Sequence, residues 1–419
     1  MRKTALIEAV TSFEATGELV DLILTSKRVD VNVKNFQRDT ALSLAVQKNE
    51  FELVDALLKA GANCNIVDCR GNTPLMHASI HGNRAITRAL IDSGAFVDVQ
   101  NERQETALLF ATYRDDLDLV IQLLEAGATP DLCTDEGYSA LIIAAYDGSS
   151  DIIHHLFEHG ADVSKQNNQG YTALHIAAWN GHVDSLNRLL LAGAPPDLQT
   201  QDKNTPLSLA AHGNHPAIID VLLPLGCDLN NADKDLDTSL HYAAYNGMSE
   251  TVEKLILCGA DPNARNRINA TPLWNAVYKN RQDVVKQLLL ANVDMEVASV
   301  GIDQHAQSDL VHYLYDQPMS PLLVSVKRNL PHLALLLVAA GYDIFKEQWL
   351  VRQEFPESMT SNNEFLSLLS HSVLNPPSLL KVCRTFIRRH LGRNVTKTVR
   401  TLEIPTTLKN YLTLNDLKN

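Results

Sequence analysis

The sequence is poor in cysteine, and its cysteines are not arranged for covalent or metal cross-linking. Six cysteines are dispersed through 419 residues, with no Cys-x-x-Cys pair and no Cys/His cluster at the spacing of zinc ligands. The adjacent His154 and His155 fall in a predicted helix, where neighbouring side chains diverge, so they do not predict a metal site. We expect reduced thiols and no metal, which is typical of a cytoplasmic or nuclear protein.

Long apolar runs are also missing. The first ten residues, Met1 to Val10, are charged and amphipathic, so they do not form the apolar block of a secretory signal peptide. The most apolar stretch, Leu333 to Ala340, is far shorter than the ~20 residues that cross a bilayer. We therefore expect no membrane association, and we interpret the glycosylation sequons at Asn269 and Asn394 as accidental matches.

Basic residues are scarce outside the C-terminal segment. From Ser378 onward there are nine Lys or Arg against two Asp or Glu, a balance of +7, while the whole chain carries −13. The preceding residues therefore carry −20, which argues against nucleic acid as the main ligand because phosphate binding depends on Lys and Arg. The hydrophobic share of 45% is nevertheless ample for a continuous core.

Residue sets for catalysis are missing as well. The sequence contains no nucleophile with a matching base, no Gly-rich phosphate loop and no metal constellation. We therefore expect no enzyme and no cofactor, and a function that depends on binding.

A period of 33 residues dominates the chain. Thr or Ser recurs on this period eight times, Leu follows two residues later each time, and Ala follows five residues later each time. Gly recurs on the same period near the end of seven of these units. The Thr or Ser positions are Thr40, Thr73, Thr106, Ser139, Thr172, Thr205, Thr238 and Thr271.

Each repeated position has a physical role in a pair of helices. The Thr or Ser can cap a helix, and Pro74, Pro206 or Pro272 directly after it supplies a first helical residue that needs no donor. Leu and Ala lie on one face of this first helix, and the small Ala allows the next helix to approach closely. The second helix ends at Gly, which can adopt a left-handed conformation. Because one pair cannot bury its apolar face alone, the pairs must stack into a solenoid.

Segments such as GYTALHIAAWNGH (170–182) and NTPLSLAAHGN (204–214) resemble ankyrin repeats. The resemblance covers about residues 1 to 350 and implies an all-α fold, an ankyrin-repeat solenoid of helix pairs with turn or hairpin connections. His175 and His241 match the family's histidine that braces the turn by hydrogen bonding. Between the last two repeats lies an insertion around Val300 to Gln317, which is either a tolerated surface loop or a segment that contacts a partner.

In ankyrin repeat proteins the partner usually lies across the concave side. The resemblance places the seventh residue after each Thr or Ser on this side, and five of the last six such residues are Tyr or Trp in a chain with 6% aromatics. Tyr, Trp and Arg dominate binding hot spots. The alternative is that these aromatics shield the seam between helices. The predicted substrate-binding residues are Tyr113, Tyr146, Trp179, His212, Tyr245 and Tyr278.

A separate helix is predicted near the C-terminal end. Ser378 can cap it and Gly392 can close it, after two prolines that interrupt the chain. Four residues follow the helical period along one side of it, and an alternative is that this side only covers the last repeat. They are Leu379, Cys383, Phe386 and Ile387.

This segment resembles a SOCS box, a small helical domain, over about Pro377 to Leu417. In that family the first helix binds elongin C, which implies that Leu379 enters an apolar pocket with Cys383 packed beside it. The second element binds a cullin, here through Leu402, Ile404, Pro405 and Leu408. The family's first proline in this element is replaced by Glu403, so the resemblance favours cullin five but leaves cullin two or a weak complex open.

Together the two resemblances predict a substrate-recognition subunit of an elongin/cullin-type ubiquitin ligase. Its partners would be elongin B/C, a cullin with its RING subunit and an unknown protein substrate. A plain ankyrin scaffold, or an adaptor that sequesters its partner, remains as the alternative. The predicted divisions are 1–37 (irregular first repeat), 38–301 (eight repeats), 302–317 (insertion), 318–350 (final repeat), 351–376 (linker and short helix) and 377–419 (SOCS box).

Overall fold

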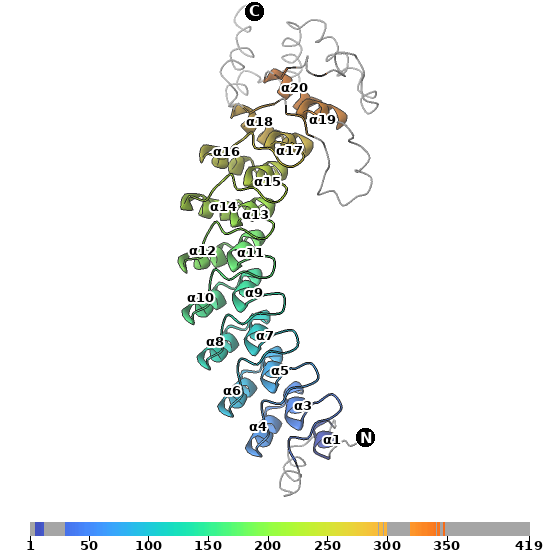
Figure 1. The fold of residues 1–419 in the computed structure, drawn as a ribbon, viewed down its shortest axis with the longest axis vertical. Helices are drawn as coiled ribbons and strands as arrows, with labels where there is room; N and C mark the ends of the chain where they lie inside the picture. The colour runs from blue at the N-terminus through green and yellow to red at the C-terminus, as the bar shows by residue number, and fades with distance from the viewer. Residues whose placement is uncertain are drawn as a thin grey trace, which may run out of the picture. The chain divides into compact units, whose positions relative to one another are not determined.

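The computed structural model describes residues 5–11, 30–291, 293–295, 297–299, 319–340, 342–343 and 347. The chain divides into two compact units between Gln201 and Asp202. Helices arranged in serial pairs make up both units (Figure 1). Across the described ranges, extended pairing is limited to three isolated bridges, so the predicted all-α class is confirmed.

Unit 1 begins with α1 (Ala5–Thr11) and continues with five helix pairs. Each first helix packs on the first helix of the next pair, and each second helix packs on the next second helix, which gives two layers (Figure 1). The first helices are α3 (Ala41–Gln47), α5 (Pro74–His81), α7 (Ala107–Tyr113), α9 (Ala140–Asp147) and α11 (Ala173–Asn180). The second helices are α4 (Phe51–Lys59), α6 (Arg84–Asp92), α8 (Leu117–Glu125), α10 (Ser150–Glu158) and α12 (Val183–Leu191).

Unit 2 contains four pairs, in which the first helices pack on one another in series and the last three second helices do the same. One second helix is shorter, because Pro224 cannot donate a backbone hydrogen bond and a 3-10 turn follows α14. The first helices are α13 (Pro206–His212), α15 (Ser239–Asn246), α17 (Pro272–Tyr278) and α19 (Pro321–Lys327). The second helices are α14 (Pro216–Leu222) with η1 (Leu223–Leu225), α16 (Ser249–Leu257), α18 (Gln282–Leu290) and α20 (Pro331–Ala339).

The predicted helix starts and core positions are confirmed. The Thr73 hydroxyl accepts a hydrogen bond from the Met76 N–H at 3.2 Å, and Thr205 caps α13 in the same way. The eight periodic Leu residues are at most 2% exposed and the eight periodic Ala residues are 0% exposed. They lie on first helices that pack in series, so the core repeats every 33 residues as the sequence does.

The periodic Gly residues after the second helices have the predicted left-handed backbone, for example Gly160 at φ 87°. A further set of turn residues was not anticipated. Asn167 accepts hydrogen bonds from the N–H groups of Gln169 (3.0 Å) and Tyr171 (2.9 Å), and the same position recurs every 33 residues in other turns. Successive turns are joined by backbone bonds such as Asn168 N–H to the Glu136 carbonyl, 3.2 Å. The turns are therefore fixed relative to the helices that follow them.

Two buried histidines connect a helix start to the next turn, as the motif implies. His241 is fully buried, contacts the Thr238 hydroxyl at 2.9 Å and lies 3.1 Å from the Ala270 carbonyl. His175 makes the equivalent contacts with Thr172 and Leu198. Burial lowers the pKa of His241 below its usual value, although the nearby carboxylate of Asp237 opposes this.

The insertion at 300–317 lies outside the described residues, but both of its ends are held. The backbones of Ser299 and Met319 exchange two hydrogen bonds, of 2.9 and 2.7 Å. The Trp274 indole N–H donates to the Met319 carbonyl at 2.9 Å. As a result α19 packs directly on α17, so the extra residues do not separate these two first helices.

Gly137 and Gly160 give a matched pair of substitutions. Both have φ near +85°, but a Cβ on Gly137 would lie 2.8 Å from the Asn168 backbone nitrogen, whereas a Cβ on Gly160 meets open space. We expect Gly160→Ala to lower the free energy of unfolding by about 1 kcal/mol and Gly137→Ala by about 2 to 3 kcal/mol. Denaturant unfolding monitored by circular dichroism measures both, and equal losses would contradict the close approach of the two turns.

His241 predicts a pH dependence of stability. Because its pKa is lowered in the folded state, the unfolded state binds the proton more readily, so stability is present above the unfolded pKa of about 6.5 and is lost as the pH falls below it. We expect His241→Gln to reduce the loss of stability between pH 7.5 and 5.5. The control is His154→Gln on the exposed surface of α10, which should keep the wild-type pH dependence. An unchanged dependence in His241→Gln would contradict the assignment.

Candidate functional site

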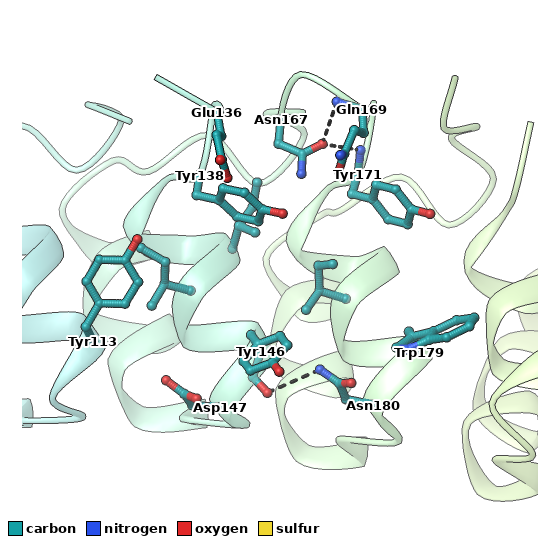
Figure 2. A pocket seen from close by; sticks show the side chains of 13 residues that line it. Tyr113, Glu136, Tyr138, Tyr146, Asp147, Asn167, Gln169, Tyr171, Trp179 and Asn180 are labelled. Carbon is teal, nitrogen blue, oxygen red and sulfur yellow. Dashed lines mark hydrogen bonds between the residues drawn. The ribbon is translucent and has the colours of Figure 1, made fainter. Parts of the chain in front are cut away.

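A hollow of about 620 Å³ lies in unit 1 over the C-terminal ends of α7, α9 and α11 and the turns before α9 and α11. Figure 2 shows that five of the thirteen residues that line it are aromatic, with rings contributed both by the helices and by the turns. The aromatic residues are Tyr113, Tyr138, Tyr146, Tyr171 and Trp179.

Three of the predicted substrate-binding residues meet at this hollow. Tyr113, Tyr146 and Trp179 occupy the same position in successive first helices, so the 33-residue period places their side chains in a row (Figure 2). Their exposed fractions are 48%, 65% and 41%. Large aromatic side chains exposed together in this way supply contact area to a partner at low entropic cost.

Two further aromatic residues of the site were missed by the sequence analysis. Tyr138 and Tyr171 precede the helix caps Ser139 and Thr172, and both are half-buried in the turns. The hydroxyl of Thr134 accepts the Tyr138 N–H at 3.1 Å, which fixes the first of these turns. Their 33-residue spacing could have identified them, because both stand directly before a periodic Thr or Ser.

The floor of the hollow is apolar and belongs to the core. Ile142 and Ile143 of α9 are 1% and 5% exposed, and Ile176 of α11 is half-buried beside them. The site therefore has a rigid base because the residues beneath it also hold the repeats together.

The charge of the hollow is negative. Glu136 contributes a carboxylate from a turn and Asp147 contributes one from the end of α9, whereas the lining includes neither Lys nor Arg. Burial and the neighbouring carboxylate of Asp115 raise the pKa of Asp147, while His182 acts in the opposite direction. Burial, followed by the carboxylates of Glu105 and Glu136, raises the pKa of the Tyr113 phenol. Burial is the main cause of both pKa shifts, and the nearby carboxylates add to it.

The three predicted residues in unit 2 are less accessible. His212 is half-buried and stacks on Tyr242, with ring centroids 4.5 Å apart. Tyr245 is half-buried, and Tyr278 is only 7% exposed and stacks on Trp274 at 5.1 Å. Tyr278 is therefore largely covered, by a residue of its own helix among others.

Other predicted features can be located as well. His154 and His155 both lie near the carboxylate of Glu158, at 3.3 and 3.6 Å. A search of the described residues finds no group of three or more His, Cys, Asp or Glu placed to hold a metal ion. In the same part of the chain no helix combines the length and apolar character needed to cross a membrane.

The residues predicted to bind elongin C and a cullin lie outside the described residues. They are Leu379, Cys383, Phe386, Ile387, Leu402, Ile404, Pro405 and Leu408. Their roles therefore stay predictions that rest on the resemblance.

Comparison with known proteins identifies both parts of the chain. A family model of ankyrin repeats matches residues 6–101, 108–194, 177–266 and 240–348, and a model of the SOCS box matches residues 375–413. A protein of Rickettsia bellii (strain RML369-C), named for its ankyrin repeats, is 43% identical over 61 residues, which are 15% of this chain and 36% of that protein. The chain thus spans about a third of the length of this curated relative. The chain is a member of the ankyrin repeat family and carries a SOCS box near its C-terminal end.

Proposed function

We propose that the chain is the substrate-recognition subunit of an elongin/cullin-type ubiquitin ligase and has no catalytic activity of its own. The observation that carries this proposal is the union, in one chain, of an ankyrin array with a SOCS box at residues 375–413. Ankyrin arrays are binding surfaces, and SOCS boxes link such surfaces to a ligase. The combination supports this role for the family in general, and the individual partners are part of the proposal.

The first SOCS element would bind elongin C. Leu379 would enter an apolar pocket of elongin C, with Cys383, Phe386 and Ile387 on the same side of the helix. Full burial of one Leu contributes about 1.5 to 3 kcal/mol, which is decisive for a small interface. The basic residues Arg388 and Arg389 stand near the C-terminal end of the predicted helix, where the helix dipole favours positive charge.

The second SOCS element would bind the cullin. Leu402, Ile404, Pro405 and Leu408 supply its apolar contacts, and Glu403 stands where the family usually has a proline. A glutamate lacks the fixed backbone angle of proline, so we expect a weaker complex with cullin five than the usual motif would give. Cullin two is the alternative partner.

The hollow in unit 1 would receive the substrate. It joins exposed aromatic rings to a buried, rigid floor, and this combination is typical of binding hot spots. The bound substrate would then be held near the ubiquitin-conjugating enzyme that the cullin and its RING subunit bring. Proximity of this kind lowers the barrier of a bimolecular reaction by several kcal/mol, with no reactive group needed in this chain.

The Leu379→Ala variant tests the link to the ligase. We expect purified wild-type protein to co-elute with elongin B/C in size-exclusion chromatography, and the variant to bind at least about tenfold more weakly because a buried Leu is lost. Lys418→Ala, a basic residue near the chain end, is the control and should behave as wild type. Equal co-elution of wild type and Leu379→Ala would support a plain ankyrin scaffold instead.

The double variant Tyr146→Ala/Trp179→Ala tests the substrate surface. Proteins captured from cells by quantitative mass spectrometry should lose the substrate but retain elongin B/C, because the proposed elongin-binding residues belong to a separate segment of the sequence. Phe157→Ala, an aromatic residue of α10 that is 42% exposed, is the control outside the hollow. If the double variant folds normally and recovers the same proteins as wild type, the hollow does not hold the substrate.

A further inference from the structure

In several repeats one side chain reaches back to the repeat before it. This residue directly follows the seventh residue after the periodic Thr or Ser, which we call the aromatic position. It stands at the end of the first helix or just after it. In unit 1 the Asn180 amide donates to the Tyr146 carbonyl at 3.2 Å, and the Arg114 guanidinium donates to the Ile80 carbonyl at 3.0 Å. In unit 2 the Asn246 amide donates to the His212 carbonyl at 2.9 Å. The repeat geometry thus brings this side chain to the preceding aromatic position.

Where this side chain is a cation in unit 2, it lies on an aromatic ring. The Lys279 Nζ is 4.3 Å from the ring centroid of Tyr245, and the Arg328 Cζ is 4.5 Å from that of Tyr278. A cation this close to the face of a tyrosine interacts favourably with the ring. In unit 2, therefore, the chain supplies cations to its own tyrosines.

In unit 1 the same repeat position lacks a cation at the hollow. In the repeat after that of Tyr113 this position is Asp147, and in the repeat after that of Tyr146 it is Asn180. The hollow therefore has a carboxylate and an amide at the position that Lys279 and Arg328 occupy in unit 2. Arg114, although close in sequence, reaches away from the hollow toward the Ile80 carbonyl and contacts the turn after α5. The exposed ring of Tyr146 therefore receives no cation from the repeat that follows it.

The surroundings of this ring favour a cation from outside. Glu136 lies on the turn side of the hollow and Asp147 on the helix-end side, with the tyrosine rings between these two elements (Figure 2). The Tyr138 ring and the half-buried Ile176 offer apolar contact for the methylene stem of a long basic side chain. The negative charge of the chain before Ser378 would also attract a basic partner.

We propose that the hollow binds a Lys or Arg side chain of the substrate, held against the Tyr146 ring with Glu136 and Asp147 as its counter-charges. This inference rests on the proposed function, in which the same face receives the substrate, and it assigns that substrate to proteins with an exposed basic segment. An acidic or purely apolar segment would offer no positive charge to Glu136 and Asp147, so it is not expected to bind here.

Peptide pools with one fixed central residue test the proposal directly. The fixed residue is Arg, Lys, citrulline, norleucine or Glu, and the flanking positions are degenerate. Citrulline has nearly the shape of arginine without its charge, so it isolates the contribution of the cation. We expect immobilised full-length protein to retain the Arg and Lys pools about tenfold more than the citrulline, norleucine and Glu pools.

Three variants of the hollow have defined outcomes. Tyr146→Ala and the double variant Glu136→Gln/Asp147→Asn should abolish the preference for Arg and Lys. Asn180→Lys should abolish it as well, because a lysine at this position would reach Tyr146 as Lys279 reaches Tyr245. Phe157→Ala lies outside the hollow and should keep the preference. Matching thermal unfolding curves exclude misfolding as the cause of any loss.

Several results would overturn the proposal. They are equal retention of the citrulline and Arg pools, a preference for Arg that survives in Asn180→Lys, and retention of no pool at all. Elongin B/C binding by the same immobilised protein is measured in parallel. If elongin B/C binds and the peptide preference is missing, this inference fails while the proposed function stands; if elongin B/C does not bind, the proposed function fails.

Discussion

The structure depends on the burial of one apolar face of each helix pair against the next pair. The periodic Leu and Ala residues are almost completely buried, and the first helices that carry them pack both on the second helix of their own repeat and on the first helix of the next. A repeat without neighbours would expose this face, so stability and function both require the array. Because Ala at the closest contact has no larger side chain, successive first helices come near enough for their last residues to interact.

This close spacing connects the core to the candidate site. In several repeats the residue that follows the aromatic position reaches the preceding repeat, and its chemistry affects whether the aromatic ring there is covered. Lys279 and Arg328 lie on the rings of Tyr245 and Tyr278, whereas Asn180 bonds only to the backbone of Tyr146 and leaves its ring exposed. One repeated geometry therefore places cations on two tyrosine rings in unit 2 and leaves an open, acidic hollow in unit 1.

Much of this architecture could be predicted from the sequence, because the 33-residue period fixes the caps, the buried Leu and Ala and the left-handed Gly residues. The accessibility of the aromatic residues could not be predicted in the same way. Tyr146 and Tyr278 occupy equivalent positions, yet one is 65% and the other 7% exposed. The exposure of a tyrosine ring depends on neighbours such as Trp274 and on the residue that the next repeat places beside it. Identifying the aromatic residues by their position in the 33-residue period does not take these neighbours into account.

The central claim is that one chain connects a substrate-binding array to a ligase through its SOCS box. Native mass spectrometry of the tagged full-length protein purified from cells tests this claim most directly. The account predicts an assembly that contains the chain together with elongin B, elongin C, a cullin and its RING subunit. Recovery of the chain free of elongin under conditions in which another SOCS box protein retains it would contradict the account.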